Sequence, residues 1–388
     1  MPRLHPEPRE RETVRPLELF FDLVFVLGFT QCTALMASQP SWEGIGRGML
    51  VLGALWFSWA GYAWLTSVID PEEGGVRIAM FAVMAGLLIA ALCVPEAFGN
   101  RAHGFAIAYG VVRVGHIILY ILASRGDVSL RRSVATHAIT TSLIVGLLLV
   151  GSFLNDGGQE ALWALAIALD ILGPALFGIA GWRLVPAHFA ERHNLVIILA
   201  LGESIVALGV ATDVDLTAGV IIAAVFGIAL AAALWWVYFD VVALVTERRL
   251  TAAPEGRVRN ALARDSYSYL HFPMVGGIVL SALGLEHTLA HISEPLDGEG
   301  AFALLGGTAI YLLGHVALRL RNAHSVNVQR LVLAVVLLAL IPVATKVAAL
   351  ATLVAVNVPL WAMIAFETSN YGDSRYRLRH GIESEPSG

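Results

Sequence analysis

The chain has 388 residues, of which 57% are apolar and only 14% are charged. Soluble domains carry about 25% charged residues, so a soluble protein of two or three domains is excluded because its surfaces would lack charge. The formal net charge of -5 provides no basic field, so we expect no nucleic-acid partner. The composition predicts an all-α integral membrane protein whose partner is the lipid bilayer.

Twelve apolar stretches are long enough to cross the hydrocarbon core as helices. The first six lie at residues 17–38, 44–66, 76–97, 103–123, 132–153 and 158–181. The second six lie at residues 187–209, 216–245, 261–290, 300–320, 328–345 and 347–367. Residues 330–367 run nearly unbroken, so eleven spans are the alternative. Residues 1–12 and 369–388 are polar, and we expect them to form unstructured tails.

The basic residues predict the orientation of these spans. With the N-terminus in the cytoplasm, almost every arginine falls on a cytoplasmic segment, whereas the outer loops hold only Arg47, Arg101 and Lys346. Cytoplasmic loops of membrane proteins carry this excess of positive charge. Twelve spans with both termini in the cytoplasm of a bacterium, in its inner membrane, fit this distribution.

Similar residues recur in the two halves of the chain. The Trp56 region of the second span resembles the Trp235 region of the eighth, and Gly115-His116 of the fourth span corresponds to Gly314-His315 of the tenth. Because these matches occur in the same order along both halves, we predict two six-helix repeats, residues 13–183 and 184–368. Since six is an even number, the repeats are parallel and are related by an axis along the membrane normal.

Ionisable residues inside the spans are the candidates for function, because each costs at least about 2.5 to 3.5 kcal/mol in a bilayer. Glu18 and Asp22 lie four residues apart on one face of the first span. Two carboxylates so close favour proton binding and suit a proton or cation relay. The alternative is a structural role, with Glu18 at the interface and Asp22 bonded to Arg15 or Arg192.

Arg113 lies close to the middle of the fourth span, on a stripe with Tyr109, His116 and Tyr120. It needs a carboxylate partner, for which Asp170, Glu203 and Asp240 are the candidates. Two interpretations of Arg113 follow. It forms a permanent structural ion pair, or it binds a substrate anion or tunes a proton relay. His116 and His315 of the tenth span are either pathway groups or buried, neutral histidines.

The seventh and ninth spans hold further candidates: His193 and Glu203 in the former, and Tyr267, His271 and Glu286 in the latter. His287 and His291 have the i, i+4 spacing of a metal pair, but a solvated helix end explains them better, so we expect no metal. Cys32 and Cys93 lie in apolar runs and provide no disulfide framework. We expect no cofactor.

Three motifs carry a resemblance to a known family. The run from Arg15 to Val26, the run from Glu191 to Ser204, and Tyr267 to His271 with Gly276-Gly277 and Glu286 resemble signatures of the bacterial low temperature requirement protein A (LtrA) family. The resemblance implies a multi-pass inner-membrane protein. The first run is also similar to the first-helix motif of TMEM175-type potassium channels, although Phe21 stands where that motif has a serine.

We therefore expect a transporter or channel for a small solute or cation, with proton coupling as one form. The expected pathway residues are Glu18, Asp22, Arg113, His116, His193, Glu203, Tyr267, His271, Glu286 and His315. An intramembrane enzyme acting on a lipid-like substrate through Glu203 or His271, and a membrane sensor or structural protein, are the alternatives. The sequence predicts no oligomeric state.

Overall fold

The computed structural model describes residues 13–155, 157–177, 181–210 and 217–380. Within these ranges the chain forms helices, apart from their connections and an isolated β-bridge between Pro295 and Ala348. The predicted tails 1–12 and 381–388 lie outside the described residues. The all-α prediction is confirmed.

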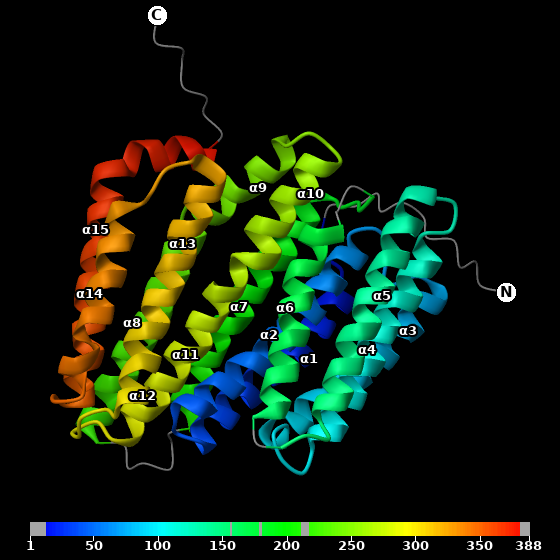
Figure 1. Ribbon diagram of the computed structural model, residues 1–388. Helices are drawn as coiled ribbons and strands as arrows, with labels where there is room; N and C mark the ends of the chain where they lie inside the picture. Colours follow the sequence, from blue (N-terminus) through cyan, green and yellow to red (C-terminus); the bar gives the residue numbers. More distant parts are fainter. Residues whose placement is uncertain (1–12, 156, 178–180, 211–216, 381–388) are drawn as a thin grey trace, which may run out of the picture. The chain divides into compact units, whose positions relative to one another are not determined.

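The chain divides into two compact units, which are treated separately below. The first unit comprises Met1–Val196 and Ala253–Phe272. Its helices are α1 (Pro16–Ser38), α2 (Trp42–Thr66), α3 (Gly74–Cys93), η1 (Val94–Glu96), α4 (Ala102–Ala123), α5 (Val128–Gly151), α6 (Gly158–Phe177), the first part of α7 (Pro186–Val210), α10 (Arg257–Ala263) and η3 (Arg264–Tyr269). Helices α3, α4, α5 and α6 pack against one another in succession (Figure 1).

The second unit comprises Ile197–Ala252 and Pro273–Gly388. It holds the rest of α7, then α8 (Ala218–Phe239), α9 (Val242–Ala252), most of α11 (His271–Ala290), α12 (Gly298–Ala301), η4 (Phe302–Gly306), α13 (Gly307–Ala323), α14 (Val328–Ala344) and α15 (Ala349–His380). Helix α14 packs between α13 and α15 (Figure 1).

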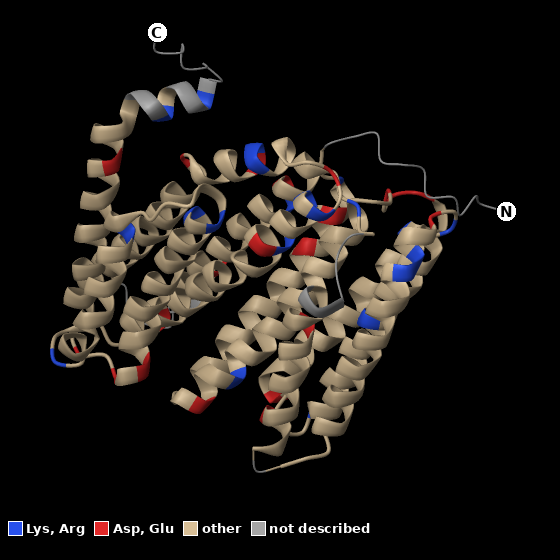
Figure 2. Ribbon diagram, turned by 45° about the horizontal axis from the view of Figure 1, so that its top comes forward, with Lys and Arg blue, Asp and Glu red and all other residues tan. Residues whose placement is uncertain are grey.

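Over the described residues, each of the twelve predicted spans coincides with a helix or with consecutive helices. Among the described residues, ten helices or helix series are long and apolar enough to cross a membrane by length and composition, α14 is a shorter apolar helix, and α6 is not among the ten. The nearly unbroken apolar run 330–367 divides into α14 and α15, with Lys346 in the break. Figure 2 shows long stretches without charge along the helices. The duplication into residues 13–183 and 184–368 stays a prediction.

The last helix extends further than the sequence indicated. Helix α15 has a kink at Tyr371, where the backbone is not helical, and its second segment continues to His380, beyond the predicted end of the twelfth span at residue 367. Ion pairs explain the extension: Arg375 lies 2.6 Å from Asp240 and 2.7 Å from Glu367. The prediction of an unstructured tail from residue 369 was wrong as far as His380, because Arg375 has two carboxylate partners in the second unit.

Helix α4 shows how these helices distribute their side chains. Ile107, Val111, Val114 and Ile118 are between 51% and 58% exposed, whereas His116 on the same helix is buried. A helix that exposes aliphatic residues and buries polar ones suits a hydrocarbon solvent, in which polar groups must find partners inside the protein. The first unit therefore has the surface of a membrane protein.

Close glycine contacts hold α11 and α13 together in the second unit. A Cβ atom added at Gly277 would lie 2.6 Å from the Gly307 carbonyl oxygen and 2.7 Å from the Tyr311 amide nitrogen. Helices in membranes associate through such small residues, since their backbones can then approach closely.

We expect Gly277→Ala to destabilise the protein by about 1 to 3 kcal/mol, because the added methyl group overlaps backbone atoms that cannot move independently. Gly146→Ala in α5 is the matched control, since nothing lies within 4 Å of a Cβ atom there. The control should be neutral or slightly stabilising through helix propensity. Thermal unfolding in detergent measures both, and equal stability of the two variants would contradict the close packing.

Candidate functional site

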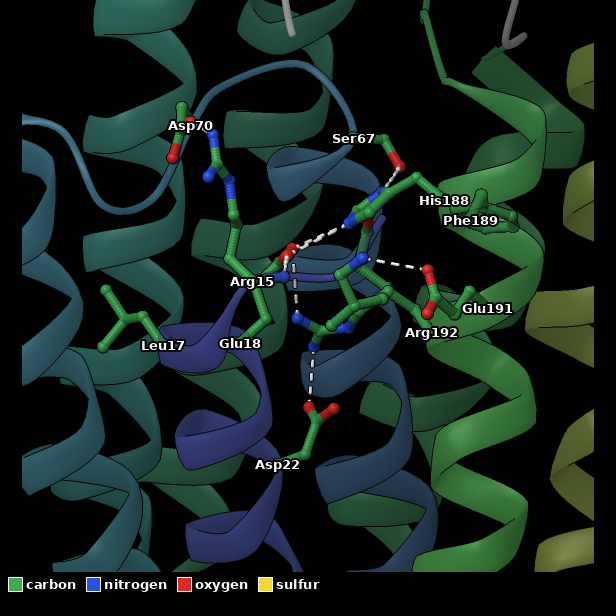
Figure 3. A network of polar contacts seen from close by, with 12 residues as sticks. Arg15, Leu17, Glu18, Asp22, Ser67, Asp70, His188, Phe189, Glu191 and Arg192 are labelled. Atoms are coloured by element: carbon green, nitrogen blue, oxygen red, sulfur yellow. Dashed lines mark hydrogen bonds and ion pairs between the residues drawn. The ribbon is translucent and has the colours of Figure 1, made fainter. Parts of the chain in front are cut away.

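Two carboxylates of α1 share one arginine of α7 in the first unit. Arg192 Nη2 lies 2.7 Å from Asp22 Oδ1, and Arg192 Nη1 lies 3.3 Å from Glu18 Oε1. All three side chains are fully buried. Figure 3 shows the guanidinium group of Arg192 between the two carboxylates. Of the two partners considered for Asp22, the structure selects Arg192.

Histidine and backbone donors complete the surroundings of Glu18. His188 Nε2 lies 2.9 Å from Glu18 Oε1, and the His188 Nδ1 atom lies 3.1 Å from Ser67 Oγ (Figure 3). The amide of Arg15 donates to Glu18 Oε2 at 2.8 Å, which caps the start of α1. The side chain of Arg15 bonds Asp70 instead, at 2.6 Å.

His188 was missing from the sequence-based candidates. It precedes Arg192 by four residues and so lies on the same face of α7, which is the signal that could have found it. We call Glu18, Asp22, His188 and Arg192 the α1–α7 cluster. Because Arg15 is paired with Asp70, the cluster has two carboxylates and one guanidinium. The hydrogen bond between Glu18 and His188 is a position at which the cluster could hold a proton.

An aromatic group adjoins the cluster. Trp59 of α2 donates its indole N–H to Asp22 Oδ1 at 2.8 Å, and its ring lies 4.9 Å from the His193 ring. His193 lies 5.1 Å from Tyr267 and 5.5 Å from His271, measured between ring centroids. The structure thus brings three predicted residues, His193, Tyr267 and His271, together beside Asp22. Among the residues that the structure describes, His193 Nε2 has no hydrogen-bond partner.

The π-helical segment η3 positions this group. A π-helix frees backbone groups from the usual pattern and is often found at functional sites. The carbonyl of Ser266 lies 2.8 Å from His271 Nδ1, and the carbonyl of Ser268 accepts the indole N–H of Trp56 at 2.7 Å. These contacts fix the ring of His271 and attach η3 to α2.

Arg113 and His116 line a separate cavity of about 110 Å³ in the first unit. Arg113 Nη2 lies 2.7 Å from Asp170 Oδ1 of α6, which identifies the carboxylate partner among the three candidates. His137 of α5 also lines this cavity, together with Ser133, Thr136 and Thr140. His137 was missing from the sequence-based candidates, although this polar stripe at spacings of three and four residues is the signal that could have found it. The remaining wall comes from α2, α4, α5, α6, η3 and Trp182.

Three predicted residues lie in the second unit. Glu203 is buried, and Glu286 is half-buried and close enough to Glu203 for their charges to interact. The ring of His315 lies 4.6 Å from that of Tyr311. None of the three lines the cavity of Arg113. Within the described part of the chain, no three His, Cys, Asp or Glu residues gather as a metal-binding group.

These observations define the class of the protein: a multi-pass helical membrane protein with buried ion pairs. A family model described as "Bacterial low temperature requirement A protein (LtrA)" matches residues 13–365. The chain therefore belongs to the LtrA family, as its three motifs indicated. It is also similar to an uncharacterized protein of Rhizobium meliloti (strain 1021), with 29% identity over 313 residues that cover 76% of this chain and 75% of the relative. No solved structure matches the chain.

Proposed function

We propose that the protein is a transporter or channel of the bacterial inner membrane that moves a small solute or cation with proton coupling. Both termini lie in the cytoplasm in this proposal, and the two halves 13–183 and 184–368 are parallel repeats. Its pathway groups are Glu18, Asp22, Arg113, His116, His193, Glu203, Tyr267, His271, Glu286 and His315.

The observation that carries this proposal is the charge of the α1–α7 cluster. An isolated buried charge is costly in a membrane, so intramembrane carboxylates without a full set of cations mark proton relays and ion pathways. Glu18 and Asp22 share the single guanidinium of Arg192. Glu18 also lies 2.9 Å from His188, and in this proposal a change in the contacts of Arg192 releases or binds a proton held between these two groups.

An intramembrane enzyme has less support. The enzyme hypothesis assigned acid–base chemistry to Glu203 or His271, which requires the group to face a substrate. Neither residue lines the cavity of about 110 Å³ in the first unit. The His188–Glu18 pair has hydrogen-bond geometry, at 2.9 Å, but both side chains are fully buried.

Proton flux into liposomes tests the proposal. The full-length protein is reconstituted with an internal pH-sensitive dye, and gradients of potassium, of sodium or of a small uncharged aromatic solute are imposed with and without a membrane potential. We expect the rate of dye-reported proton movement to fall at least about tenfold in Glu18→Gln and Asp22→Asn, which corresponds to about 1.4 kcal/mol of activation free energy. The reason is that these variants lose the negative charges that bind the proton.

Glu160→Gln is the control, since Glu160 pairs with Arg47 and is partly exposed. This variant should keep the wild-type flux. Absence of proton movement under every gradient, or wild-type flux in both Glu18→Gln and Asp22→Asn, would overturn proton-coupled transport.

A further inference from the structure

The cavity of the first unit has the size of a small organic molecule. Its volume is about 110 Å³, compared with roughly 150 Å³ for an engineered apolar cavity that binds benzene. The space is therefore of the order of one small ring. Aromatic side chains form much of its wall: Phe57, Trp64, Tyr120, Trp182 and Tyr269.

The charges in the wall are balanced. Arg113 is neutralised by Asp170 at 2.7 Å, and Arg264 is neutralised by Asp265 at 2.7 Å. A ligand with a net charge would add an uncompensated charge to a site inside the helix bundle, which is costly. The ion pairs of this cavity therefore favour an uncharged ligand over an anion or a cation.

Two buried polar side chains of the wall lack hydrogen bonds. Neither ring nitrogen of His116 makes one with good geometry, although the Gly61 carbonyl is near, and the Tyr120 hydroxyl makes none with the described residues. Both side chains are buried and both line the cavity. An unsatisfied buried polar group costs about 1 to 3 kcal/mol, so such groups usually have a partner that completes them.

We propose that this cavity binds a small uncharged molecule that consists of an apolar ring and one hydrogen-bonding group. The ring packs among Trp64, Trp182 and Tyr269, and the polar group bonds His116 and Tyr120. This inference rests on the proposed function. It names the class of transported substrate as neutral, phenol-like solutes.

Calorimetric titration of the full-length protein in detergent tests the proposal with four probes of similar size: phenol, toluene, benzoate and benzylammonium. Phenol should bind most tightly. Toluene should bind about three- to tenfold more weakly, because it offers no hydrogen bond. Benzoate and benzylammonium should bind at least about tenfold more weakly than phenol, because each brings an unpaired charge.

Two variants test the assigned contacts. Tyr120→Phe and His116→Leu should each lower the affinity for phenol about three- to tenfold and leave that for toluene unchanged, a readout that general loosening of the fold would not give. Tyr109→Phe is the matched control, since it removes a buried hydroxyl from the same helix outside the cavity wall. Its phenol affinity should equal that of the wild type.

Tighter binding of a charged probe than of phenol would overturn the proposal, as would an unchanged preference for phenol over toluene in both variants. Since binding is measured without a membrane gradient, the two proposals fail separately. Proton flux without phenol binding overturns the neutral-ligand site alone. Phenol binding without any flux overturns transport and supports the binding site.

Discussion

Replacement of Arg192 by glutamine is expected to lower the free energy of unfolding by about 3 to 5 kcal/mol, because it leaves the buried carboxylates of Glu18 and Asp22 without their shared cation. Arg192 contacts both at 3.3 and 2.7 Å. Denaturation in mixed micelles measures the loss. The difference from wild type should shrink as the pH falls, since protonation of the two carboxylates removes the uncompensated negative charges.

Arg47→Gln is the matched control for this change. Arg47 also bonds a carboxylate, that of Glu160 at 2.6 Å, but the side chains are 23% and 27% exposed. A partly exposed pair contributes about 0 to 1 kcal/mol. Equal losses in the two arginine variants, or a loss in Arg192→Gln that stays constant with pH, would contradict the role of Arg192 in balancing a buried charge.

The helices of this protein could be predicted from the sequence because their signals are local. A run of some twenty apolar residues specifies a membrane helix by itself, and over the described residues all twelve predicted spans coincide with helices. The extension of α15 to His380 could not be predicted, because it depends on pairing of Arg375 with Asp240 and Glu367. Both carboxylate side chains are nearly buried and precede the tail in the chain, so the polar composition of the tail does not reveal them.

The candidate site was partly predictable for a similar reason. Spacing along one helix placed Glu18 with Asp22, and Arg113 with His116, since residues three or four apart share a face. Spacing did not identify Asp170 as the partner of Arg113, because that pairing depends on how α6 is rotated toward α4. His188 precedes Arg192 by four residues and His137 lies on a polar stripe of α5, but spacing along one helix does not show which groups of other helices a histidine faces.

Substitution of Asp170 by asparagine is expected to cost about 3 to 5 kcal/mol, because Arg113 then remains as an unpaired, buried cation. Arg113 is 2% exposed and bonds Asp170 at 2.7 Å. The double variant Arg113→Met, Asp170→Leu should recover most of this stability, since replacing both partners by apolar residues of similar size is often neutral. Denaturation of the single and double variants in the same micelles measures the recovery.

The same pair of variants separates charge balance from shape in the cavity. In Asp170→Asn the positive charge of Arg113 is no longer neutralised, so the affinity for benzoate should rise relative to that for phenol. In the double variant the wall is again uncharged and phenol should stay preferred. Benzoate binding that is unaffected by Asp170→Asn would mean that the Arg113–Asp170 pair does not set the charge preference of the cavity. The pair would then serve the packing of α4 against α6, and only the stability prediction would remain.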